Sequence, residues 1–410
     1  MRALREYAVV TGAYWVFTLT DGALRMLMLF HLHRLGYSPV EVVSLFLFYE
    51  FFGIVTNFVG GWLGARFGLK WTLFLGLSLQ IVACSVLAWR AQALTIPLVM
   101  AAQGLSGIAK DLTKMSSKSY VKLVVPEGDS RGLMKWVALL TGSKNALKGL
   151  GFFLGGALLG LVGFANANWG MSAALALALM VSILLLPQAM GRAKEKPGLS
   201  ALISRDPRIN WLSAARLFLF ASRDVWFVFA LPIYLSSELG WSHAGSGAFL
   251  AAWVIGYGMV QASAPRLVGG KGAAKALDGG RALRLTLLLS LPLAVIAALL
   301  YAGLDPALTL IGGLVIFGVV FAACSALHSF LIVHYAERGQ VSLGLGFYYS
   351  ANAAGRLAGT IASGLVYQAA GSGKSGLIAC LAVSLASVLL SALLCLLLIR
   401  AEERLAAPSS

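Results

Sequence analysis

Long apolar runs, broken by short polar stretches, make up most of the sequence. Each run is close to the roughly 20 residues that an α-helix needs to cross the apolar part of a lipid bilayer. The polar breaks predict twelve membrane-spanning helices, and we therefore expect an all-α integral membrane protein. The expected spans lie near residues 8–32, 39–63, 71–89, 94–114, 134–163, 169–190, 211–236, 244–264, 282–303, 306–335, 341–369 and 375–399.

One longer polar stretch divides these runs into two sets of six. It covers residues 191–210, is rich in charged residues, and is expected to be a cytoplasmic linker. The predicted domains are an N-terminal six-helix bundle, residues 1–190, and a C-terminal six-helix bundle, residues 211–410.

Two pairs of short segments repeat between the halves, about 204–207 residues apart. Leu35-Gly36-Tyr37-Ser38 follows the first span, as Leu239-Gly240-Trp241-Ser242 follows the seventh. Ser143-Lys144-Asn145-Ala146 lies in the fifth span, as Ser350-Ala351-Asn352-Ala353 lies in the eleventh. Matches at equivalent helices predict two parallel six-helix repeats. This arrangement resembles the major facilitator fold, whose substrate site lies near the bilayer midplane between the halves.

Charged residues are sparse and unevenly placed. Only 12% of the 410 residues are charged and 59% are hydrophobic, whereas soluble proteins carry roughly 25% charged residues. The net charge of +16 comes mainly from Lys and Arg in one set of loops, which the positive-inside rule assigns to the cytoplasm. We therefore expect cytoplasmic termini, with membrane lipid rather than nucleic acid facing this charge. A bacterial inner membrane is the expected location.

The sequence lacks the motifs of an enzyme or a metalloprotein. We find no catalytic triad, phosphate-binding loop or metal cluster, and the four cysteines lie in apolar stretches without metal-ligand spacing. A non-enzyme without a cofactor, acting as a monomer, is the expectation.

The loop after the second span resembles the major facilitator pattern Gly-x-Leu-x-Asp-Arg-x-Gly-Arg-Lys. The stretch Gly61–Lys70 contains its glycines and two of its basic residues, Arg66 and Lys70, but Ala65 stands where the family has Asp. Arg66 in this loop is a candidate gating residue. Lys110 and Asp111, near the cytoplasmic end of the fourth span, are two more.

Two lysines lie four residues apart near the start of the fifth span. Each ammonium group costs about 2.5–3.5 kcal/mol at the bilayer centre, and residues at i and i+4 share one helix face. Lys144 and Lys148 therefore predict an anionic partner, with the neighbouring Asn145 as a further candidate ligand.

Acidic residues also occur within the spans. Asp21 and Arg25 lie one turn apart in the first span, either as a structural ion pair or as a proton carrier beside a substrate-binding cation. Glu50 lies in an aromatic run of the second span, where burial favours its protonated form. It is either a proton carrier or a buried acid paired with a cation.

Cations outnumber acids among the charges that we place deep in the membrane. The acids are Asp21, Glu50 and Asp224, half as many as the cations. Unpaired buried charge is costly, so the excess predicts an anionic substrate. We expect Arg25, Lys144, Lys148, Arg223 and Arg356 to bind it, with Asn145 and Asn352; Arg216 completes the set of six cations.

Several longer stretches resemble the ArsJ-type organoarsenical efflux permeases, a branch of the major facilitator superfamily. They are Tyr14–Met26, Phe46–Asn57, Gly107–Leu112 and Leu139–Gly149, and the resemblance is densest over residues 11–160. It implies export of 1-arseno-3-phosphoglycerate, the compound that a partner glyceraldehyde-3-phosphate dehydrogenase makes when arsenate replaces phosphate. The scarcity of paired cysteines argues against a carrier of trivalent arsenic, which prefers thiolates.

The expected mechanism is alternating access of the two halves, with Asp21 or Glu50 exchanging a proton to drive export. Two alternatives remain open. One is an exchanger of organophosphates or inorganic anions without arsenic specificity, and the other is a membrane receptor that transports nothing.

Overall fold

The computed structural model describes residues 2–35, 39–187, 204–241, 243–268, 277–337 and 341–406, and within these ranges every regular element is a helix. Polar backbone groups in lipid must pair within their own segment, and a helix does this for every apolar run. The helices are α1 (Arg2–Arg34), α2 (Pro39–Phe67), α3 (Leu69–Trp89), α4 (Ile96–Val124), α5 (Ser130–Leu161), α6 (Gly163–Leu185), α7 (Pro207–Phe227), α8 (Ala230–Ser237), α9 (His243–Ala262), α10 (Ala264–Val268), α11 (Gly279–Tyr301), α12 (Pro306–Tyr335), α13 (Val341–Ala369) and α14 (Gly373–Ala406).

Twelve predicted spans account for these helices, because two spans are broken. The seventh span is interrupted between α7 and α8, and the short α10 continues the eighth span after α9. Pro232 explains the first break. Its backbone nitrogen has no hydrogen to donate to the Val228 carbonyl oxygen, and its ring clashes with that carbonyl group. The Ala230 N–H, freed by the break, donates instead to Ser363 Oγ at 3.2 Å.

Six stretches of the described chain are long and apolar enough, by length and composition, to cross a membrane: Leu69–Trp89, Gly163–Leu185, Pro207–Ser237, Gly279–Tyr301, Pro306–Tyr335 and Gly373–Ala406. Most of the candidate site residues lie elsewhere, in α1, α4, α5 and α13. The apolar helices therefore form much of the scaffold, and the more polar helices carry most of the candidate chemistry.

The chain forms two compact units. Unit 1 comprises residues 1–129, 143–203 and 336–350, and unit 2 comprises residues 130–142, 204–335 and 351–410. Two helices, α5 and α13, each contribute to both units, with the change after Gly142 and after Ser350. Residues 191–203 of the predicted linker lie outside the described ranges, and the predicted domain boundaries stay a prediction.

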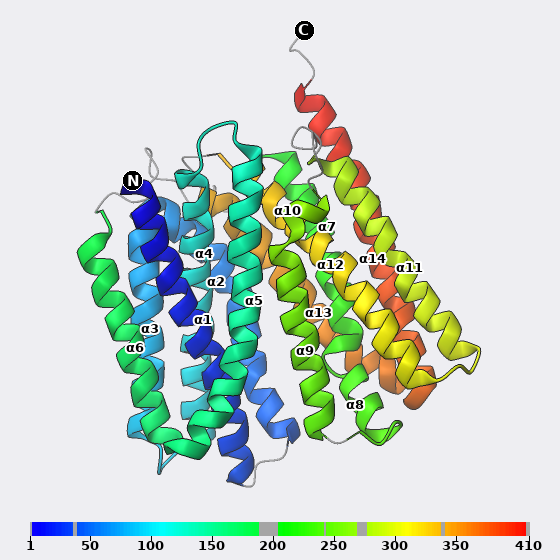
Figure 1. Ribbon diagram of the computed structural model, residues 1–410, viewed down its shortest axis with the longest axis horizontal. Coiled ribbons are helices and arrows are strands. Elements are labelled where there is room, and N and C mark those ends of the chain that lie inside the picture. Colours follow the sequence, from blue (N-terminus) through cyan, green and yellow to red (C-terminus); the bar gives the residue numbers. More distant parts are fainter. Residues whose placement is uncertain are drawn as a thin grey trace. The chain divides into compact units, whose positions relative to one another are not determined.

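In unit 1, α3 packs between α4 and α6, and α1 contacts α4 and α6 (Figure 1). Close contacts between α3 and α4 depend on Gly76, where a Cβ would lie 2.9 Å from the Ala109 backbone oxygen. The buried Lys70 ends its side chain on the backbone oxygen of Leu186, with Nζ donating at 2.8 Å. This hydrogen bond joins the start of α3 to the end of α6.

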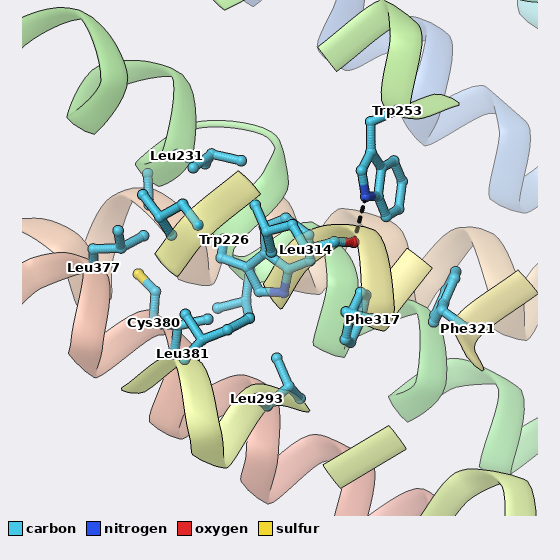
Figure 2. Packing of buried hydrophobic residues seen from close by; sticks show 14 of the residues in the cluster. Trp226, Leu231, Trp253, Leu293, Leu314, Phe317, Phe321, Leu377, Cys380 and Leu381 are labelled. Atoms are coloured by element: carbon cyan, nitrogen blue, oxygen red, sulfur yellow. Dashed lines mark hydrogen bonds between the residues drawn. The ribbon is translucent and has the colours of Figure 1, made fainter. Parts of the chain in front are cut away.

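The core of unit 2 is a cluster of aromatic and aliphatic side chains around Trp226 (Figure 2). Trp226 packs edge-on against Trp253 and Phe317, with ring centroids 6.1 Å and 5.2 Å away. Trp253 Nε1 donates to the Leu314 backbone oxygen at 2.8 Å, as the dashed line in Figure 2 shows. Aromatic pairs of this kind contribute about 0.5–1.5 kcal/mol each beyond burial, so the cluster holds α7, α9 and α12 together.

Glycines four residues apart set the contact between the first and fifth helices of each predicted half. In α5, a Cβ on Gly151 or Gly155 would lie 2.5 Å or 2.2 Å from a backbone oxygen of α1. In α13, a Cβ on Gly355 or Gly359 would lie 2.1 Å or 2.7 Å from a backbone oxygen of α7. Small residues at this spacing let helix backbones approach closely, and the same device occurs in both units.

Candidate functional site

The α1–α5 contact brings several of the predicted site residues of unit 1 to one pair of helices (Figure 1). Trp15 Nε1 donates to Ser143 Oγ at 3.0 Å, which fixes the start of the contact. Further along the two helices, the backbone oxygen of Lys148 lies 2.7 Å from where a Cβ on Gly22 would be. Lys148 is therefore next to the segment of α1 that contains Asp21.

Burial differs between the acid and the predicted cations of this contact. Asp21 is only 4% exposed, whereas the predicted cations Arg25, Lys144 and Lys148 are half-buried. Asn145 is also half-buried, and Lys148 Nζ lies 5.8 Å from the centroid of the Phe152 ring. This contact therefore contains one deeply buried carboxylate and three partly accessible predicted cations.

In unit 2, the fully buried carboxylate of Asp224 accepts hydrogen bonds from two of the predicted cations. Arg223 Nε donates to Asp224 Oδ1 at 2.6 Å, and Arg356 Nε donates to Asp224 Oδ2 at 3.2 Å. Asp224 thus joins α7 to α13. Two guanidinium groups around one carboxylate leave this triad with a net positive charge, although each arginine has the carboxylate as a partner.

Arg216 is the most deeply buried of the predicted cations in unit 2, at 3% exposed. Its Nε donates to Asn352 Oδ1 at 2.9 Å and its Nη1 donates to the Ser325 backbone oxygen at 3.1 Å. The guanidinium also lies over the Phe220 ring, 4.0 Å from the centroid. Asn352, predicted to contact substrate, thus orients Arg216 in this structure.

The predicted gating residues of α4 form an ion cluster. The buried Asp111 accepts from Lys114 Nζ at 2.5 Å and lies 3.9 Å from Lys110 Nζ. A second contact lies one turn further along α4, where Lys118 Nζ donates to the Tyr349 hydroxyl at 2.7 Å. Lys114 Nζ faces the same ring, 4.6 Å from its centroid, so Tyr349 receives two cations of α4.

An aromatic contact holds the basic residue near the end of α2. Ala65 is buried where the family pattern has Asp, and the guanidinium of Arg66 lies over the Trp62 ring, 5.2 Å from its centroid. The predicted gating residue therefore contacts an aromatic face. Glu50 lies in α2, but its side chain is not among those that the structure describes.

Residue-level reading of the sequence missed several polar contacts of the site. Tyr349 and Lys118 are not among the candidates named from the sequence, because an aromatic residue in an apolar helix is common and Lys118 is one of many basic residues near a predicted cytoplasmic loop. Tyr257 and Gln261 of α9 were not identified as site residues, because single polar residues are common in apolar helices. Among the described residues, no group of three or more His, Cys, Asp or Glu side chains is placed to hold a metal ion.

Comparison of the sequence with models of known protein families identifies the class to which this chain belongs. The family model of the Major Facilitator Superfamily matches residues 10–327, and the chain belongs to this family. It is therefore a multi-pass membrane transporter and not an enzyme. Membership of this family also confirms the predicted twelve-helix, two-repeat fold.

Solved structures of transporters share this fold. The human organic anion transporter MFSD10 (TETRAN) matches with a TM-score of 0.75 and 18% identity, over 96% of this chain and 99% of that one. A bacterial homologue of the iron transporter ferroportin matches with a TM-score of 0.75 and 16% identity, over 97% and 99% of the two chains. The transporter FucP matches with a TM-score of 0.71 and 15% identity, over 95% and 99%. No curated protein matches the sequence.

Proposed function

We propose that this transporter exports an anionic organoarsenical, 1-arseno-3-phosphoglycerate, and so confers resistance to arsenate. The observation that carries the proposal is the cation excess on one pair of packed helices in each half of the sequence. Arg25, Lys144 and Lys148 lie on α1 and α5, and Arg216, Arg223 and Arg356 lie on α7 and α13. A substrate with a phosphate at one end and an arsenate ester at the other supplies two anionic groups for these cations.

The sequence resemblance over residues 11–160 supports the arsenical within this anionic class. The functional partner would be a glyceraldehyde-3-phosphate dehydrogenase, which makes the substrate in the cytoplasm. The solved transporter MFSD10 is described as an organic anion transporter, which is compatible with an anion as cargo. The distribution of Lys and Arg supports cytoplasmic termini, and we propose a bacterial inner membrane as the location.

Proton exchange at Asp21 drives export in this proposal, with Glu50 as the second candidate carrier. Asp21 is deeply buried in α1, one residue from the contact with the Lys148 backbone. Protonation and release there would change the charge beside the anion. Substrate ligands would include Asn145 and Asn352, and Arg66, Lys110 and Asp111 would close the cytoplasmic side during alternating access.

The direct test is uptake into everted membrane vesicles. The dehydrogenase, glyceraldehyde-3-phosphate, NAD and arsenate are supplied outside, so that the arsenylated product forms in situ at the cytoplasmic face. We expect arsenic to accumulate in vesicles that contain the transporter, and to stay at background when arsenate or the dehydrogenase is omitted. Equal accumulation without the dehydrogenase would contradict the organoarsenical substrate.

A second candidate is an exchanger of organophosphates or inorganic anions, because the described cations recognise phosphate and arsenate oxygens alike. Competition separates the two. Excess 3-phosphoglycerate should inhibit arsenic uptake weakly if the arsenylated substrate is preferred. Export of ordinary sugar phosphates at the same rate would favour the exchanger.

The lysines of α5 distinguish a transporter from a receptor that transports nothing. We expect the double variant Lys144→Gln/Lys148→Gln to lose arsenic uptake, since removing both cations leaves the anion uncompensated. Lys135→Gln is the matched control, because Lys135 lies in the same helix and is exposed. Wild-type uptake by the double variant would refute the role of α5 in anion binding.

A further inference from the structure

Three buried polar atoms on one face of α12 lack a hydrogen-bond partner among the described residues. They are both ring nitrogens of His328 and the hydroxyl oxygen of Ser329. Both side chains are fully buried. A buried donor or acceptor without a partner destabilises the fold, and a helix core accepts apolar residues at such positions more readily. Two adjacent residues of this kind indicate a group that is present only part of the time.

A polar network leads up to these atoms from the preceding turn of α12. Ser325 is its centre: its hydroxyl accepts from the Tyr257 hydroxyl at 3.0 Å and from Gln261 Nε2 at 3.1 Å. Its backbone oxygen accepts from Arg216 at 3.1 Å. Residues three and four positions apart share a helix face, so His328 and Ser329 lie on the same face of α12 as this network. Arg216 gives the network its positive charge.

We propose that His328, Ser329 and Arg216 form a subsite for one oxyanion group of the transported anion, a phosphate or an arsenate ester. The proposal rests on the anion transport proposed above. A neutral imidazole offers one donor and one acceptor, and a serine hydroxyl offers a donor. A singly protonated phosphate or arsenate group carries acceptor oxygens and one O–H donor, so it matches this set, while Arg216 balances its charge.

The enclosure of these atoms makes the subsite depend on helix movement. His328 and Ser329 have no exposed surface, so an anion reaches them only when helices packed on α12 move apart. The helix α7 is one of these, because Arg216 donates to the Ser325 backbone oxygen of α12. The helix break between α7 and α8 gives a place where this span bends. Until an anion replaces them, the hydrogen bonds from Arg216 to Asn352 and to the Ser325 backbone oxygen keep α7 close to α12.

The test measures thermal unfolding of the purified full-length protein, with and without a titrated anion. The anions are 3-phosphoglycerate, inorganic phosphate and inorganic arsenate, each tried separately. A ligand that binds only the folded protein raises the unfolding temperature with its concentration, which yields an apparent Kd. The variants are His328→Leu and Ser329→Ala. The control is His334→Gln, because His334 lies in the same helix and is exposed.

We expect His328→Leu to unfold at or above the wild-type temperature without anion, because it removes two unpaired polar atoms. Its apparent Kd should rise about tenfold or more, with a smaller rise for Ser329→Ala, since each lost hydrogen bond to a charged group weakens binding. His334→Gln should bind as the wild type does.

Wild-type affinity in both His328→Leu and Ser329→Ala would overturn the subsite and leave anion transport standing. If His328→Leu fails to fold, Ser329→Ala decides the question by the same criterion. If none of the three anions shifts the wild-type unfolding temperature, the subsite fails, whereas the proposed anion transport is decided separately by arsenic uptake into vesicles that form the arsenylated substrate in situ. If the anions shift the unfolding temperature as expected but vesicles show no preference for the arsenylated substrate, the subsite stands and the arsenical as substrate is rejected.

Discussion

Asp224 is the shared acceptor for two of the predicted substrate-binding arginines of unit 2. Its carboxylate accepts from Arg223 of the same helix and from Arg356 of α13. Both arginines are predicted from the sequence to bind substrate, and a local reading pairs Asp224 with Arg223 alone. The contact with Arg356, 132 residues away in the sequence, follows only from the way α7 packs on α13.

Replacing Asp224 by Asn should destabilise unit 2 by about 3–5 kcal/mol, the range for removing one partner of a buried ion pair. The loss arises because two guanidinium groups keep their charges without a carboxylate between them. Thermal unfolding of the purified protein measures it.

Asp206→Asn is the matched control for this change. Asp206 caps α7 and forms a partly exposed ion pair with Arg208. Asn caps helices as well as Asp does, and an exposed pair contributes at most about 1 kcal/mol. Equal destabilisation by the two substitutions would show that burial of Asp224 carries no special weight.

At the scale of helices, the glycine pairs of α5 and α13 explain how the charged residues come together. Gly151 and Gly355 are 204 residues apart, and so are Gly155 and Gly359. The tetrapeptides that begin at Ser143 and Ser350 are 207 apart. The predicted repeat is therefore present, but the tetrapeptides differ by almost one helical turn from the register set by packing. Short similar segments match by chance more easily than glycine positions that are fixed by backbone contacts.

Gly155→Val should separate α1 from α5 and reduce both stability and transport. A Cβ at this position would lie 2.2 Å from the Ala23 backbone oxygen, and a backbone cannot rotate away as a side chain can. The measurements are thermal unfolding and vesicle uptake.

Gly160→Ala tests whether any glycine of α5 would have this effect. Gly160 is exposed, and a Cβ added there would have no neighbouring atom within 4 Å, so Ala should be neutral or stabilise by up to about 1 kcal/mol. An unaltered unfolding temperature for Gly155→Val would contradict the close helix contact.

At the scale of the whole chain, α13 changes its packing partners partway along its length. Its first residues, up to Ser350, belong to unit 1, and the remainder belongs to unit 2. In unit 1 this first segment contacts α2 closely, where a Cβ on Gly61 would lie 2.8 Å from the Gly346 Cα. Ser350 Oγ adds a hydrogen bond to the Ile54 backbone oxygen at 3.0 Å. In a transporter that works by alternating access, such a contact forms and breaks in each cycle.

A disulfide between α2 and α13 should therefore stop transport. A Cβ on Gly64 would lie 3.1 Å from the Ser342 Cβ, within a few tenths of an ångström of the roughly 3.5–4.5 Å found in disulfides. We expect the double variant Gly64→Cys/Ser342→Cys to lose vesicle uptake under oxidant and to regain it with a reductant.

The two single-cysteine variants, treated with the same oxidant, should keep their activity. The four native cysteines are buried and free, so they do not compete for the cross-link. Full uptake by the cross-linked protein would mean that the contact between α2 and α13 persists throughout the cycle.

The amino-acid sequence by itself determined the membrane class, the twelve spans and the list of charged residues within them. These properties are local, because each apolar run must satisfy its own backbone hydrogen bonds in lipid. Only the tertiary structure decided the partners: Asp224 holds two arginines, Asn352 orients Arg216, and Tyr349 receives two lysines. These contacts join segments far apart in the chain, so helix packing sets them and no local pattern encodes them. The ring nitrogens of His328, which have no hydrogen-bond partner among the described residues, were also found only in the structure. A sequence shows that a residue is polar but not whether a partner lies beside it.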